Sequence, residues 1–87
     1  MISYTNSAFW KGYTKLPTHI KDIAKKQYKL FAHDPHHASL HFKRVHSTKP
    51  IYSARTNRGY RAVGILNNNT IIRFWVGSHD DYDKLLK

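Results

Sequence analysis

The segment IYSARTNRGYRAVGILNNNTIIRFWVG, residues 51–77, decides the fold class of this chain. It contains three short runs rich in β-branched and aromatic residues, at 51–55, 60–66 and 70–77, and this composition is typical of strands. The connectors NRG and NNN suit tight hairpins, because Gly and Asn accept positive φ angles. The segment therefore predicts a three-stranded antiparallel meander with Gly59 in the left-handed conformation.

The sequence before the meander has a helical period. Residues 7–16 have one apolar stripe, and residues 17–34 have a second one with lysines mostly on the opposite face. Pro17 suits the first turn of the second helix, and the residue before Pro35 is pushed out of the helical region. Residues 36–50 alternate only in part, so we expect an irregular or edge segment. The order predicts an α+β fold, in which an N-terminal helical hairpin packs on one face of a small antiparallel β-sheet and a short helical turn ends the chain.

Length and composition limit the class of protein. The chain has 87 residues, enough for one domain, which we assign to 1–87. It has no cysteine, which excludes disulfides, thiolate nucleophiles and cysteine-bound metals and fits a reducing cytoplasm. Its apolar runs are too short to span a bilayer, and its N-terminus has no basic segment followed by an apolar run. We expect a soluble cytoplasmic protein without a membrane partner.

The net charge indicates the kind of partner. Fifteen Lys and Arg stand against five Asp and no Glu, which gives a formal charge of +10. Three of the five acids lie at 80–83, so residues 1–79 carry thirteen basic side chains against two acidic ones, a charge of +11. A field of this sign attracts polyanions and makes their binding depend on salt.

Three arginines recur around the first hairpin, at Arg55, Arg58 and Arg61. A three-residue NRG loop would place Arg55 directly across from Arg61, and Thr56 across from Tyr60. Like charges in this arrangement cost stability. Either the guanidinium groups splay into water, or an anion such as a phosphate sits between them, for which their fork geometry is suited. The spacing leaves both interpretations open.

The order of elements, with GYRAVG at 59–64 and FWVGSHDDYDKLL at 74–86, resembles the RelE/ParE superfamily of toxins from type II toxin-antitoxin systems. LPTHIKDIAKK at 16–26 and DPHHASLHFKRVH at 34–46 extend the resemblance over nearly the whole chain. In that superfamily, RelE-like members cut messenger RNA on the ribosome and ParE-like members act on DNA gyrase. Both are neutralised by an antitoxin encoded alongside. The resemblance thus implies a cognate antitoxin, held with the toxin in a hetero-oligomer.

The resemblance also implies roles for particular residues. Arg61 falls where RelE-like nucleases place an arginine that binds phosphate and stabilises the transition state, and His79 and Tyr82 fall where they place a basic or imidazole side chain and a tyrosine. Arg73 is either a surface residue or part of the same basic face. The residues expected to bind RNA are His41, Lys43, Arg44, Arg55 and Arg73. The chain departs from the family by having no glutamate to serve as a base and by carrying three aspartates in its terminal segment.

Two other groups of residues have alternative interpretations. Five histidines crowd fourteen residues, but without Cys or Glu and with no recognised ligand spacing they do not predict a metal site: His33, His36, His37, His41 and His46. Phe74 and Trp75 should point to opposite faces of the sheet, one under the helices and the other free to stack on a base or dock the antitoxin.

We therefore expect a metal-independent and cofactor-free endoribonuclease that acts on messenger RNA bound to the ribosome. A 2′-hydroxyl would attack the neighbouring phosphate, Arg61 would stabilise the developing charge, and His79 would transfer a proton because its ordinary pKa lies near neutrality. Tyr82 would stack on a base, orient it or assist proton transfer. The alternative is a ParE-like gyrase inhibitor without nuclease activity, and a third is an inactive relative that binds nucleic acid.

Overall fold

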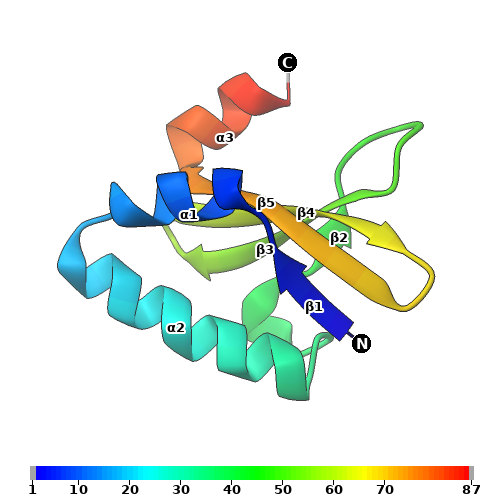
Figure 1. Ribbon diagram of the computed structural model, residues 1–87, viewed down its shortest axis with the longest axis horizontal. Helices are drawn as coiled ribbons and strands as arrows, with labels where there is room; N and C mark the ends of the chain where they lie inside the picture. The colour runs from blue at the N-terminus through cyan, green and yellow to red at the C-terminus, as the bar shows by residue number, and fades with distance from the viewer. Residues whose placement is uncertain (1, 87) are drawn as a thin grey trace.

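The computed structural model describes residues 2–86, which form a five-stranded sheet with helices on both of its faces (Figure 1). The elements in chain order are β1 (Ile2–Thr5), α1 (Ser7–Thr14), α2 (Thr18–His33), the 3₁₀ turn η1 (Ala38–Leu40), β2 (Lys43–Arg44), β3 (Ile51–Asn57), β4 (Tyr60–Asn67), β5 (Thr70–Ser78) and α3 (His79–Leu85). The strand order is β1-β5-β4-β3-β2, so β4 is central. No helix within residues 2–86 is long and apolar enough to cross a membrane.

The predicted α+β class and the β3-β4-β5 meander are confirmed. The sheet is larger than predicted and mixed, because β1 adds a strand parallel to β5 and β2 adds a two-residue edge strand beside β3. Four residues before a helix are too few to show a strand period, which is why β1 was not predicted.

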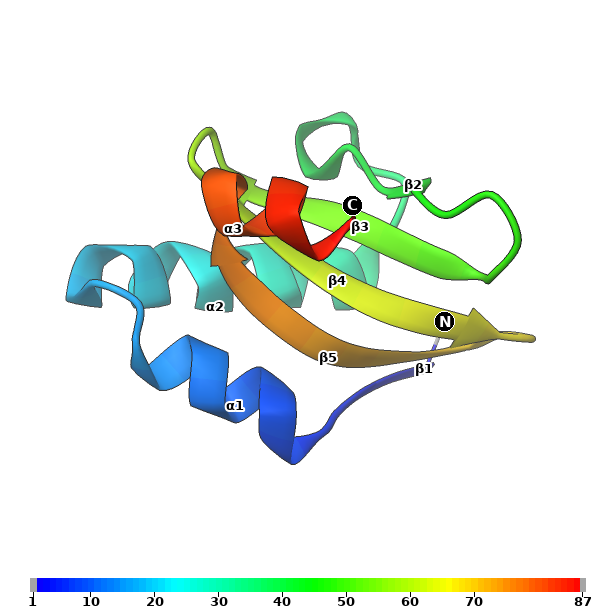
Figure 2. The same ribbon diagram turned by 90° about the horizontal axis from the view of Figure 1, so that it is seen from above.

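Helices α1 and α2 cover one face of the sheet, here called the hairpin face, and α3 covers the other, the α3 face (Figures 1 and 2). The hairpin face buries two apolar clusters. One joins Phe9 and Leu16, Ile20 of α2 and Val76 of β5, and the other joins Phe31, Leu40 and Ile71. Each such buried side chain contributes about 1.5–3 kcal/mol, so these clusters attach both helices to the sheet.

Gly12 explains how α1 lies so close to β5. A Cβ atom at this position would stand 2.6 Å from the Val76 carbonyl oxygen, so a side chain there would push the helix away from the strand. Glycine weakens an isolated helix. Here its lack of a side chain permits the close approach, and the Asn6 side chain helps to start α1 by accepting a hydrogen bond from the Phe9 N–H at 3.0 Å.

The turn between β3 and β4 differs from the predicted one. Arg55 does pair with Arg61, but Asn57 rather than Thr56 pairs with Tyr60, and Thr56 forms a bulge in β3. No glycine within residues 2–86 has a positive φ, so the expected left-handed Gly59 is wrong. The reason is local, because the Gly59 N–H donates to the Asn57 side-chain oxygen at 2.8 Å and closes a turn of Arg58 and Gly59 alone.

A second bulge changes the faces of β5. The register between β4 and β5 shifts at Phe74, since Val63 pairs with Trp75 while Gly64 pairs with Arg73. Phe74 lines a groove with Leu85 of α3 and Leu86 after it, and the centre of the Trp75 ring lies 6.4 Å from that of Tyr82. The expectation that one of these two aromatic residues packs under α1 and α2 is therefore wrong, because the extra residue interrupts the alternation.

Candidate active site

Tyr82 anchors α3 to the sheet. Its hydroxyl donates to Ser53 Oγ of β3 at 3.3 Å, and both side chains are buried, with 8% and 1% of their surface exposed. The Ser78 side chain caps the start of α3 by accepting from the Asp81 N–H at 3.2 Å. The helix is therefore held over β3 and β4, the two strands that carry the paired arginines.

Arg61 lies under this helix with an unused donor. Its guanidinium carbon is 6.0 Å from the centre of the Tyr82 ring. Its Nη1 atom is buried and has no hydrogen-bond partner among residues 2–86. A buried donor left without an acceptor costs about 1–3 kcal/mol. An anion bound at this guanidinium would remove that cost.

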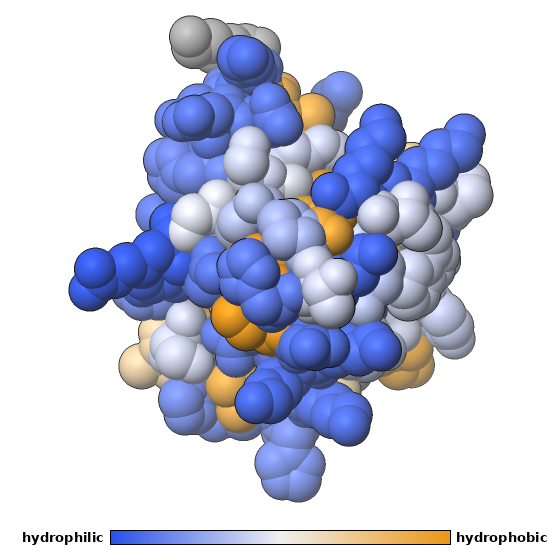
Figure 3. All heavy atoms as spheres, turned by 90° about the vertical axis from the view of Figure 1, so that its left-hand side faces the viewer, coloured by the Kyte–Doolittle hydropathy of each residue, from blue (hydrophilic) through white to orange (hydrophobic). Residues whose placement is uncertain are grey.

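His79 is the first residue of α3 and stands beside Tyr82, with 5.9 Å between the ring centres. Its side chain is 45% exposed, so a ligand can reach the ring. Nδ1 lies 3.4 Å from the Asp83 carboxylate one helical turn later, an ion pair when the imidazole is protonated. The backbone N–H of His79 donates to the Gly59 carbonyl at 2.7 Å and joins α3 to the turn between β3 and β4. This turn and the polar side chains around it belong to a mostly hydrophilic end of the molecule (Figure 3).

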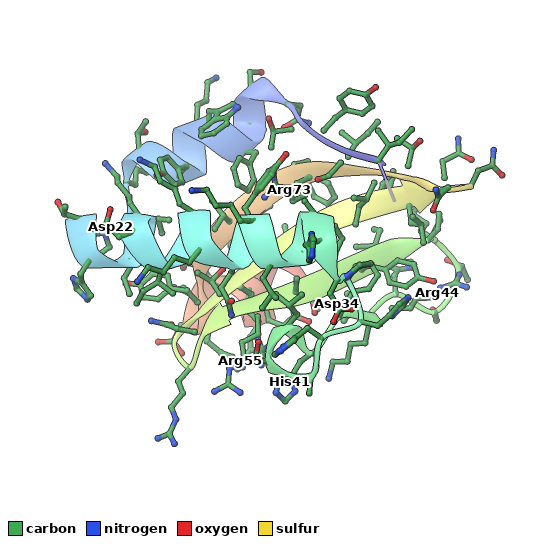
Figure 4. The ribbon with its side chains drawn as sticks, turned by 90° about the horizontal axis from the view of Figure 1, so that it is seen from below. Asp22, Asp34, His41, Arg44, Arg55 and Arg73 are labelled. Atoms are coloured by element: carbon green, nitrogen blue, oxygen red, sulfur yellow. The ribbon has the colours of Figure 1, made fainter. Side chains whose placement is uncertain are left out.

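Arg55 and His41 form a contact next to the group of Arg61, Tyr82 and His79. Arg55 Nη1 lies 3.2 Å from His41 Nε2, and Figure 4 shows the two side chains next to each other at the β3 side of the sheet. His41 is exposed and follows η1. Because Arg55 is the cross-strand partner of Arg61, this pair continues the cluster around Tyr82.

The structure separates Lys43 and Arg44. Lys43 pairs with Ser53 and so shares its face, the one under α3. Arg44 uses Nε to donate to the carbonyl oxygens of His46 at 3.1 Å and Lys49 at 3.2 Å, which shapes the loop before β3. Figure 4 shows Arg44 away from Arg55, beside that loop.

Arg73 lies on the hairpin face, between α1 and α2 (Figure 4). Its guanidinium stands 3.9 Å from the Tyr28 ring centre and 4.8 Å from that of Phe9. Burial lowers the pKa of Arg73 below its ordinary value, and the neighbouring Tyr28 partly offsets this effect. Arg73 is thus apart from the basic face around Arg61, which was one of the two positions that the sequence left open for it.

The predicted residues that the structure brings together on the α3 face or at its β3 edge are Arg61, His79, Tyr82, Arg55, His41 and Lys43. Sequence reasoning missed Ser53 and Asp83. The spacing of Asp83, four residues after His79, could have predicted their contact, whereas no pattern marks Ser53 as the partner of a tyrosine hydroxyl. Among residues 2–86, no three His, Cys, Asp or Glu side chains come together to hold a metal ion.

Comparisons with known proteins agree with this fold. The family model described as "ParE-like toxin domain" matches residues 18–84. RelE in the RelB-RelE antitoxin-toxin complex of Methanococcus jannaschii is similar in structure, with a TM-score of 0.77 and 19% identity over 97% of this chain and 99% of that one. YafQ from Escherichia coli gives a TM-score of 0.71 and 16% identity over 92% and 94%, and a YoeB/ParE toxin from Agrobacterium tumefaciens gives 0.70 and 10% over 91% and 99%.

No curated protein matches the sequence significantly. The structural likenesses lie below 25% identity and establish the fold, while the family model covers most of the chain. The chain therefore belongs to the ParE-like toxin domain family, within the RelE/ParE superfamily of toxins from toxin-antitoxin systems.

Proposed function

We propose that this toxin is an endoribonuclease that cleaves messenger RNA on the ribosome without a metal ion. The observation that carries the proposal is the arrangement on the α3 face. A buried Arg61 nitrogen without a hydrogen-bond partner among residues 2–86 lies near Tyr82, the ring of His79 is 5.9 Å from the ring of that tyrosine, and Arg55 is across the ladder. Guanidinium groups bind phosphate, and imidazole transfers protons near neutral pH.

In the proposed reaction, the 2′-hydroxyl gives its proton to a general base as its oxygen bonds to the neighbouring phosphorus, and the bond to the 5′-oxygen breaks. Arg61 and Arg55 hold the phosphate oxygens on which negative charge develops. His79, paired as the imidazolium with Asp83, gives its proton to the departing 5′-oxygen. The products are a 2′,3′-cyclic phosphate and a 5′-hydroxyl. Tyr82 positions Arg61 and the ring of His79 through its buried attachment to Ser53.

The proposed partners are an antitoxin and the ribosome with its messenger RNA. RelE of Methanococcus jannaschii was crystallised with the antitoxin RelB, and we propose that a cognate antitoxin likewise binds this chain in a hetero-oligomer. The dependence on the ribosome rests on the resemblance to RelE-like toxins. The positive charge of the chain fits a substrate bound within ribosomal RNA, because polyanions are attracted over distance.

A second candidate is inhibition of DNA gyrase, and the name of the matched family, ParE-like, favours it. An inhibitor that only binds a protein needs no imidazole beside an arginine. The test is a translation extract that receives the purified toxin, with and without ribosomes, followed by mapping of the messenger RNA ends. Cleavage only when ribosomes are present supports the proposal. Intact RNA together with blocked supercoiling in a gyrase assay replaces it with the second candidate.

A further inference from the structure

His41 has a backbone conformation that side chains rarely adopt. Its φ and ψ are 46° and 43°, in the left-handed region, where glycine is common and asparagine, aspartate and histidine are the most frequent other residues. It is held there because Leu40 before it is 1% exposed in the core and the His41 N–H donates to the Ala38 carbonyl at 3.3 Å. Strained positions of this kind cluster at functional sites. The backbone thus presents the exposed imidazole at the β3 edge.

The contact with Arg55 gives one nitrogen of this ring the role of hydrogen-bond acceptor. A guanidinium has donors and no acceptor, so His41 Nε2, 3.2 Å from Arg55 Nη1, must accept the hydrogen bond. Its free electron pair, the part of the ring that can take up a proton, faces the guanidinium that is expected to hold phosphate.

Two imidazoles therefore flank the paired arginines. His41 contacts Arg55, and His79 stands next to Tyr82, whose ring lies over Arg61. Two neighbouring histidines of the same segment are occupied in local turns: the His37 ring accepts from the Ser39 N–H, and the His46 ring accepts from the N–H groups of Thr48 and Lys49.

We propose that His41 is the general base of the cleavage reaction, an inference that rests on the proposed ribonuclease function. When phosphate binds, Arg55 turns its N–H groups from His41 Nε2 to the phosphate oxygens. Nε2 then takes the proton of the 2′-hydroxyl as that oxygen bonds to phosphorus, and the 5′-oxygen leaves with the proton from His79. One proton is taken and one is given, so no metal ion or further reactant is needed.

Two substitutions of His41 distinguish a general base from a residue that only holds Arg55 in place. In His41→Gly the backbone keeps a conformation that glycine accepts readily, and the missing ring leaves room for added imidazole. In His41→Gln the side-chain oxygen can still accept the Arg55 hydrogen bond but cannot take a proton at neutral pH. His33→Ala, which removes an exposed histidine from the end of α2, is the control for losing an imidazole.

The measurement is the single-turnover rate of messenger RNA cleavage on purified ribosomes, with folding verified by circular dichroism. We expect both His41 variants to lose about 10²–10⁴-fold in rate. We also expect added imidazole to restore the Gly variant at least about tenfold but not the Gln variant, and His33→Ala to match the wild type.

A His41→Gln rate within threefold of the wild type, or a Gly variant that imidazole does not restore, overturns the assignment of the base. If the wild type cleaves and Arg61→Ala does not, the proposed function stands whatever the His41 variants do. A wild type that does not cleave at all removes the proposed function, and this inference with it.

Discussion

Arg55 and Arg61 are direct partners across the β3-β4 ladder, and their guanidinium groups turn to different neighbours. Arg55 contacts the ring of His41, while Arg61 lies near the ring of Tyr82 with one nitrogen that has no hydrogen-bond partner among residues 2–86. The repulsion between the two guanidinium groups is thus reduced in part, because each group turns toward other side chains and not only toward water. What remains is a pair of donors suited to an anion.

Inorganic phosphate should therefore stabilise the fold through this pair. Compared with chloride at equal ionic strength, we expect phosphate to raise the melting temperature by several degrees, because about 1 kcal/mol corresponds to about 4–8 °C in a domain of this size. Removing either partner, in Arg55→Ala or Arg61→Ala, should abolish the effect. Arg58→Ala removes an equal charge at the exposed turn and should retain it. An equal phosphate effect in all three variants would contradict a specific site.

Arg61→Ala should lower the cleavage rate by about 10²–10³-fold, the usual cost of losing a group that stabilises transition-state charge. Its free energy of unfolding should stay within about 1 kcal/mol of the wild type, because the substitution removes both a like-charge contact and an unpartnered donor. Single-turnover kinetics and urea unfolding measure the two quantities. A variant that loses activity only in proportion to a loss of folded protein would show a structural role.

The hydroxyl of Tyr82 should matter for stability more than for chemistry. Tyr82→Phe and Ser53→Ala each remove one partner of a buried hydrogen bond, and each should lower the free energy of unfolding by about 1–2 kcal/mol. The double variant should cost clearly less than the sum of the two, since only one interaction exists to be lost. Fully additive effects in a double-mutant cycle would mean that this hydrogen bond does not hold α3 on the sheet.

Gly12→Ala should destabilise the toxin by about 1–3 kcal/mol through overpacking, although alanine favours helices. The reason is the 2.6 Å separation between the added Cβ and the Val76 carbonyl oxygen. The matched control is Ala8→Gly on the exposed side of α1, which should cost about 0.5–1 kcal/mol by helix propensity alone. A stabilised Gly12→Ala variant in urea unfolding would show that α1 does not approach β5 so closely.

Arg73→Met should leave messenger RNA cleavage within about threefold of the wild type, because Arg73 lies between Tyr28 and Phe9 on the face opposite Arg61. Lys43→Met removes a lysine from the α3 face and should weaken binding to ribosome-bound RNA, with a smaller dependence on salt. Equal losses of binding in the two variants would contradict the separation of the faces.

Helical periods were enough to predict both helices, and strand composition with turn residues was enough to predict the meander. The pairing of Arg55 with Arg61 was predicted from a three-residue loop, and it holds although the turn itself differs. The details that place side chains depend on contacts that no period encodes. Strict alternation would put Arg73 on the same face as Trp75, the α3 face. The bulge at Phe74 interrupts the alternation and places Arg73 on the hairpin face instead. The bulge at Thr56 depends on one hydrogen bond from Gly59 to Asn57.

The candidate site, like the fold, was predictable only in part. Arg61, His79 and Tyr82 were predicted through the family resemblance, and the structure places them together. The contact of His41 with Arg55 joins residues 14 apart in sequence through the irregular segment before β2. Its geometry follows from a left-handed residue after a 3₁₀ turn, which sequence spacing does not reveal.

The central claim is that a ribosome-bound RNA provides its own 2′-hydroxyl as the nucleophile at the α3 face. The most direct measurement uses a defined messenger RNA on purified ribosomes, first mapped for the cut and then rebuilt with a single 2′-deoxynucleotide on the 5′ side of it. We predict a 2′,3′-cyclic phosphate end on the unmodified RNA, no cut at the modified position and no cut without ribosomes. A cut at the 2′-deoxy position, or intact RNA in every lane, would contradict the account.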